Sequence, residues 1–172
     1  MPTHPLAFLR LPYGLLMALD SRMLHFWMQP THYLVRLVHI LSMSLFFGIT
    51  VMIDVGLLNR SSAERLRVLG GLALPWLHGS FTVAIVTGLA LFFYDPVHVG
   101  SHAYFAPKLI FIVLALLNAT AGHRLVYRQG LFGGAAITGR GRWIALMSLF
   151  SWTAVVVCSC LNTEAMPKVF LR

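Results

Sequence analysis

Charged residues are scarce in this chain. Asp, Glu, Lys and Arg make up only 10% of its 172 residues, whereas a soluble domain carries about 25%. Hydrophobic residues make up 58%, above the roughly 45–50% of soluble domains. Because so few polar side chains cannot cover a water-exposed surface, the composition excludes a soluble fold. It indicates an integral membrane protein with one compact domain.

Cysteine and acidic residues are also few. Two Cys exclude an extracellular disulfide scaffold, and 12 Phe, 4 Trp and 5 Tyr exclude a disordered chain. Five acidic residues against 13 Lys and Arg give a net charge of +8. The basic residues stand at the ends of apolar runs, where they meet phospholipid headgroups. We therefore expect the lipid bilayer, and not nucleic acid, as the partner of this charge.

Four apolar runs predict transmembrane helices. A helix needs about 20 residues to cross a hydrocarbon core of about 30 Å, and a backbone in lipid must satisfy its hydrogen bonds internally. The expected spans are residues 33–58, 72–94, 105–127 and 143–161. The predicted fold is all-α, a four-helix membrane bundle over residues 31–172.

The N-terminal segment, residues 1–30, is predicted to lie outside this bundle. Residues 6–28 are apolar but are interrupted by Arg10, Pro12 and Asp20. We expect an interfacial helix on the membrane, with Phe26 and Trp27 at the lipid–water boundary. A fifth spanning helix is the alternative.

Arginine predicts the orientation. The chain carries Arg after the first and third spans: Arg60, Arg65, Arg67, Arg124, Arg128, Arg140 and Arg142. Near the loop between the second and third spans the only basic residue is Lys108. Loops rich in Lys and Arg remain on the cytoplasmic side of a membrane, so loops 59–71 and 128–142 are expected in the cytoplasm. Loop 95–104 and the C-terminus are then periplasmic, in a bacterial inner membrane.

Two histidines within spans are candidate haem ligands. His78 lies about sixteen residues, or roughly 24 Å, from Tyr94, and His123 lies at a similar depth from Ala106. The short connection makes the second and third helices expected neighbours, so the two imidazoles could ligate one b-type haem. Small residues on the same helices, such as Ala84 and Gly88, either make room for the haem or only let helices pack closely.

A second histidine cluster lies near the outer boundary. His39 with His98 or His102 could hold a second haem, and Arg36 could face one of its propionates. The same region suits copper, because Met sulfur selects Cu(I). The copper set is His25, Met28, His32, His39, Met43, His98 and His102. Interfacial His without a ligand is the third interpretation.

Other polar groups in the spans are few. Asp54 could pair with Arg60 or take part in proton uptake, and spans two to four contain no acidic residue, which argues against a multi-carboxylate relay. Cys158 and Cys160 point about 200° apart on a helix and are expected to be apolar thiols.

Several short motifs carry a family resemblance. They are the stretch from His39 to Gly48, Asp54 to Leu58, Leu74-Pro75-Trp76, Thr87-Gly88, Phe105 to Lys108, Leu117-Asn118 and His123. In this order, over residues 33–161, they resemble a small uncharacterised bacterial four-helix inner-membrane family. That family is distantly similar to the membrane domain of the copper-resistance D proteins. The resemblance implies the fold, the membrane location and a handling of copper or haem.

Together these features predict a membrane cytochrome b, an electron-transfer protein or subunit rather than a stand-alone enzyme. It would exchange electrons with quinone or a periplasmic redox partner, and it would need a partner protein or self-association into a homo-oligomer. The metal-binding residues of the two haem sites would be His39, His78, His98, His102 and His123. The alternatives are a copper-handling inner-membrane protein and a redox-silent membrane anchor of a larger complex.

Overall fold

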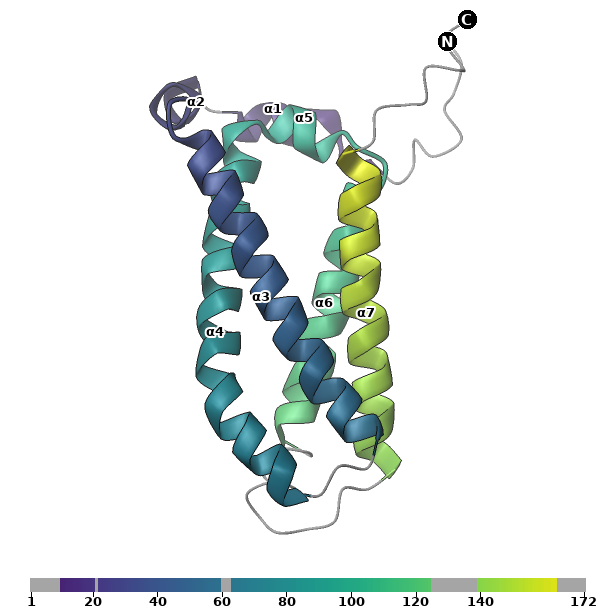
Figure 1. Cartoon of the computed structure of the whole chain (residues 1–172). Coiled ribbons are helices and arrows are strands. Elements are labelled where there is room, and N and C mark those ends of the chain that lie inside the picture. Colours follow the sequence, from purple (N-terminus) through teal and green to yellow (C-terminus); the bar gives the residue numbers. More distant parts are fainter. Residues whose placement is uncertain (1–9, 21, 60–62, 125–138, 164–172) are drawn as a thin grey trace, which may run out of the picture.

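Four long helices form the bundle that the apolar runs predict. The computed structural model describes residues 10–20, 22–59, 63–124 and 139–163. The long helices are α3 (His32–Leu58), α4 (Ala63–Tyr94), α6 (Phe105–Gly122) and α7 (Gly139–Thr163). Each is long and apolar enough to cross a membrane, and the described part of the chain contains no strand. The protein is therefore an all-α, multi-pass membrane bundle (Figure 1).

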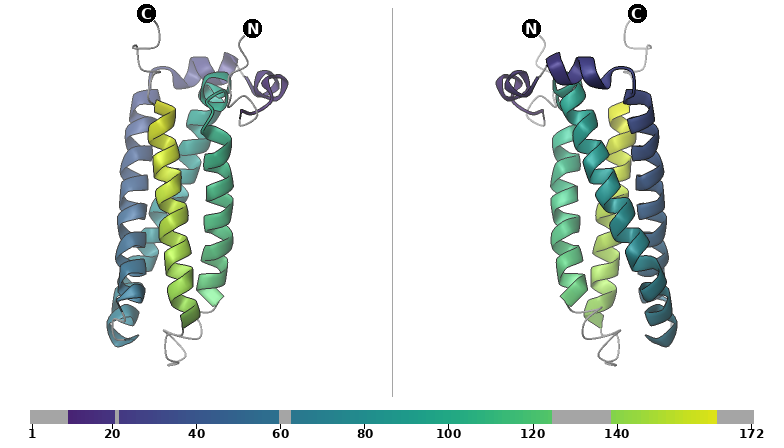
Figure 2. Two further views of the ribbon diagram at one scale, coloured as in Figure 1. Left: turned by 90° about the vertical axis from the view of Figure 1, so that its right-hand side faces the viewer. Right: turned by 90° about the vertical axis from the view of Figure 1, so that its left-hand side faces the viewer.

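Three short helices lie at one end of this bundle. They are α1 (Tyr13–Leu19), α2 (Arg22–Met28) and α5 (Pro96–Gly100), and the end that carries them is called the α5 end below. Two side views place all three at that end only (Figure 2). With seven residues each, α1 and α2 are too short to span a membrane.

The N-terminal segment thus differs from the single interfacial helix that the sequence predicts. Asp20 ends α1 with extended backbone angles, φ −75° and ψ 112°, and α2 then runs in a new direction. The buried side chain of Leu16 fastens α1 to α5, beside Gly100. Because of this break the chain can follow two sides of the bundle end. Residues 1–9 lie outside the described residues.

The helices pair unequally. The extensive contacts are those of α3 with α4, α6 with α7 and α3 with α7. Helix α3 runs diagonally, from α4 at the α5 end toward α7 at the opposite end (Figure 1). The sequence predicts that α4 and α6 are neighbours, but each packs chiefly against a different helix.

Buried apolar side chains fill the middle and the end opposite α5. One cluster joins Phe46 of α3 to Ala115 of α6 and to Trp152 and Val155 of α7. The Phe46 and Trp152 rings meet edge to face at 4.6 Å. A second cluster lies nearer the opposite end and contains Ile53, Leu57, Ala73 and Ala145.

Polar contacts fix the helix ends. The Asn162 side chain accepts from the backbone N–H of Tyr104 at 3.2 Å, which joins the start of α6 to the end of α7. At the opposite end the Arg142 guanidinium donates to the Leu58 carbonyl at 3.3 Å, which satisfies one of the last carbonyls of α3.

Candidate functional site

His39 is half-buried between α3 and α4. Its Nδ1 lies 3.0 Å from the Ala84 carbonyl oxygen and 3.0 Å from the Thr87 hydroxyl oxygen. A carbonyl oxygen only accepts, so Nδ1 carries the proton and donates. This contact fixes the tautomer, and Nε2 is the ring nitrogen that keeps its lone pair.

Small residues on α4 create the space for this ring. A Cβ at Gly88 would lie 3.0 Å from His39 Cε1, tighter than ordinary contact. Ala84 and Ser80, one and two turns before Gly88 along the same face, are buried. Of the two uses that the sequence allows for these small residues, the close approach of a neighbouring helix is the one observed here.

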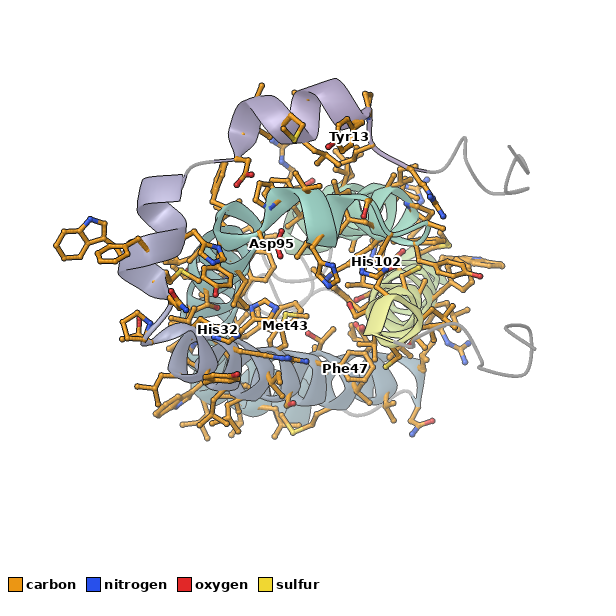
Figure 3. All side chains as sticks on the ribbon, turned by 90° about the horizontal axis from the view of Figure 1, so that it is seen from above. Tyr13, His32, Met43, Phe47, Asp95 and His102 are labelled. Carbon is orange, nitrogen blue, oxygen red and sulfur yellow. The ribbon has the colours of Figure 1, made fainter. Side chains whose placement is uncertain are left out.

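A cation from α6 lies in the same half of the bundle. The half-buried Lys108 interacts electrostatically with His39 of α3 and with Cys158 of α7. Seen from the α5 end, Met43 and Phe47 of α3 also point toward the interior of the bundle (Figure 3). From the sequence, Lys108 entered only the helix orientation and the family resemblance. A lysine directly after Pro107, at the start of an apolar run, is the signal that could have marked it.

His98 and His102 form a pair at the α5 end. Their ring centroids are 5.1 Å apart in an edge-to-face arrangement. The Asp95 carboxylate caps α5 by accepting from the His98 backbone N–H at 3.0 Å, which orients the segment that carries both rings. Burial lowers the pKa of His102, and the nearby His98 and Arg10 lower it further.

His102 and His39 lie on different sides of the bundle. In Figure 3 His102 lies on the opposite side of the bundle from α3, which carries Met43. In the described part of the chain no hydrogen bond or ring contact joins His39 to His98 or His102. Arg36, one turn from His39 toward the α5 end, is exposed.

His78 and His123 occupy less enclosed positions. The exposed His78 donates from Nδ1 to the Leu74 carbonyl at 2.8 Å, one turn back in its own helix. His123 caps the end of α6 and is also exposed. Helices α4 and α6, which carry these two imidazoles, are not extensively packed against each other, and the joint ligation of a haem by His78 and His123 stays a prediction.

The outer members of the copper set make other contacts. His25 and His32 both stack on Tyr94, with centroids 4.4 Å and 5.0 Å from its ring and interplanar angles of 9°. His25 also hydrogen-bonds the Tyr94 carbonyl through Nδ1 at 3.2 Å, and Met28 is buried. His25 thus holds α2, and His32 the start of α3, against the end of α4.

Metal ligands are not gathered in one place in the part of the chain that the structure describes. Within residues 10–20, 22–59, 63–124 and 139–163, no three His, Cys, Asp or Glu side chains converge to hold a metal ion. Haem needs only two imidazoles, so the absence of such a three-residue group in the described residues does not bear on haem.

No protein-family model, curated protein or solved structure matches the chain.

Proposed function

We propose that the protein is a membrane electron-transfer protein that binds a b-type haem in the half of the bundle nearest α5. The observation that carries the proposal is the position of His39, half-buried with Nδ1 donating to a backbone carbonyl. Histidines that ligate a metal almost always donate their other ring N–H to a carbonyl, a carboxylate or water. His39 would hold the haem iron through Nε2.

The remaining donors of this region suit the same group. His102 is the proposed second ligand, and His98, 5.1 Å from it, is the alternative. Lys108, which already interacts electrostatically with His39, would neutralise a propionate, and Arg36 would serve the second. A donor set of imidazole and cation thus matches both the iron and the carboxylates of haem.

Haem b supplies reversible one-electron transfer. The chain holds the His39 ring in one tautomer through Ala84 and Thr87, and this hydrogen bond raises the basicity of Nε2. Apolar surroundings and the Lys108 charge set the potential. The proposed electron partners are quinone or a periplasmic redox protein, with the α5 end periplasmic in the inner membrane. A chain this small is expected to work with such a partner or with a second copy.

We also propose a second haem site, formed by His78 of α4 and His123 at the end of α6. The His78 Nδ1 contact with Leu74 leaves its Nε2 available in the same way. This site requires α4 and α6 to be bridged by the haem itself, because they are not extensively packed.

Absorbance spectra of the purified full-length protein test the proposal. After expression with a haem precursor, we expect a Soret band that sharpens and shifts on reduction by dithionite. The band should be lost in His39→Ala, or halved if the second site also holds haem, and kept in His25→Ala, since His25 stacks on Tyr94 outside the bundle. Loss of half the haem in His78→Ala or His123→Ala would indicate the second site. A protein that stays colourless, or equal spectra for His39→Ala and wild type, would refute haem at His39.

Copper handling is the second candidate, which the family resemblance also favours. Two observations support copper handling: the rings of His98 and His102 are paired, and Met43 points toward the interior of the bundle. Elemental analysis separates the two: stoichiometric copper in a colourless protein, lost in His98→Ala, supports it. A metal-free protein that co-purifies with a dehydrogenase would support the third candidate, a redox-silent anchor.

A further inference from the structure

Asp54 is a carboxyl group buried inside a membrane-spanning helix. It lies on α3, one turn before Leu58 at the helix end, and is 7% exposed. Ile53 and Leu57 on either side of it belong to the apolar cluster with Ala73 of α4 and Ala145 of α7. The group is therefore enclosed by three helices that present apolar side chains at this level.

Only one of its two oxygens has a partner. The Ser148 side chain of α7 hydrogen-bonds the carboxyl group, whereas the buried Oδ2 has no hydrogen-bond partner. The neighbouring hydroxyl of Thr50 does not serve it, because Thr50 donates to the Phe46 carbonyl at 2.9 Å. The hydrogen bonding that a carboxylate would need is thus incomplete.

The charges nearby do not compensate an ionised group. Of the cations described at this end, Arg142 donates to the Leu58 carbonyl, and Arg124 and Arg140 are exposed. Arg60, the partner that the sequence suggests for Asp54, lies outside the described residues. Within the described part of the chain no cation pairs with the carboxyl. An unpaired carboxylate in a membrane interior is costly, whereas a neutral acid needs less hydrogen bonding.

We propose that Asp54 is a proton-binding site within the membrane. In the protonated form Oδ1–H donates to Ser148, and Oδ2 is a carbonyl oxygen, whose lack of a partner costs less than an orphaned donor. The carboxyl lies about 6 Å along the helix from the last residue of α3, so its proton exchanges with water at the end opposite α5. The site does not require haem. With the proposed haem in the same chain, it would take up a proton that balances an added electron.

Infrared spectroscopy of the full-length protein in lipid vesicles tests this site. The chain has three Asp: Asp20, Asp54 and Asp95. Asp labelled with carbon-13, in a variant carrying Asp20→Asn and Asp95→Asn, leaves Asp54 as the one labelled carboxyl. We expect its protonated-acid carbonyl band at neutral pH, a shift of that band in D2O, and a higher frequency in Ser148→Ala.

Each other outcome overturns the proposal. A labelled carboxylate band in place of the acid band would mean that Asp54 is ionised. An acid band that does not respond to D2O would mean a trapped proton and no exchange. Asp54→Asn in the same labelled background should remove the acid band. These readouts need no haem, so they remain informative if the protein proves colourless.

Discussion

The ring of His39 packs against Gly88 so closely that no other residue type fits opposite it unchanged. A Cβ at Gly88 would lie 3.0 Å from Cε1 of the imidazole. This contact places the proposed ligand and its tautomer-fixing partners, Ala84 and Thr87, in one arrangement. The absence of a side chain at Gly88 of α4 thus makes room for the His39 ring of α3.

Gly88→Ala is expected to displace His39. Overpacking a helix contact costs about 1–3 kcal/mol, so thermal unfolding should begin at lower temperature, and haem content should fall if the proposed function holds. Gly79→Ala is the matched control, because nothing lies within 4 Å of a Cβ at that position of the same helix. Melting curves in detergent check both variants. A Gly88→Ala protein as stable as Gly79→Ala would contradict the close contact.

Tyr94→Ala is expected to release α2 from α4. Both His25 and His32 stack on this ring, and aromatic pairs contribute about 0.5–1.5 kcal/mol each. Limited proteolysis should then cut faster within residues 20–31, while the four long helices stay protected. Tyr94→Phe keeps the ring and should behave as wild type. Equal cleavage in Tyr94→Ala and wild type would show that other contacts hold α2.

Leu16→Ala is expected to undock α1. Leu16 is 1% exposed against α5, and truncating such a leucine costs about 2–5 kcal/mol in a packed interior. Amide hydrogen exchange over residues 13–19 should accelerate strongly. Leu15→Ala is the control, because Leu15 is 51% exposed and should change the exchange little.

Stability should fall in acid through His102. Its pKa is lowered from the ordinary 6.5 by burial, His98 and Arg10. The unfolded chain therefore binds the proton more readily, so the contribution of His102 is present above pH 6.5 and is lost as the pH falls below it. Melting temperatures measured from pH 7.5 to 5 should fall less in His102→Gln than in wild type. His98→Gln should give part of that effect, and parallel curves for all three proteins would exclude it.

The apolar runs predicted the long helices well because hydropathy marks what lies in lipid. The predicted span 33–58 corresponds to His32–Leu58, and 105–127 begins where α6 begins. The start of α4 at Ala63 rather than at residue 72 escaped this signal, since a helix continues into water without needing apolar side chains. Residues 125–127 of the third predicted span lie outside the described residues.

The candidate site was predictable only in part. His39, His98 and His102 stood out because an ionisable side chain in or near a membrane is energetically costly and often marks a functional site. Nothing in the spacing, however, shows that His39 would be set against Ala84 and Gly88, or that His25 and His32 would both stack on Tyr94. These are contacts between helices, and helical periodicity within one helix does not specify its neighbour.

The sequence by itself determined a four-helix membrane protein, because 58% hydrophobic residues in four long runs can satisfy their backbone only as helices in lipid. The tertiary structure alone decided which helices pair, where the N-terminal segment breaks and that the Asp54 carboxyl is left with an unpartnered oxygen. The physical reason is that lipid is as apolar as the helix faces, so helix pairing depends on shape and hydrogen bonds and not on hydropathy.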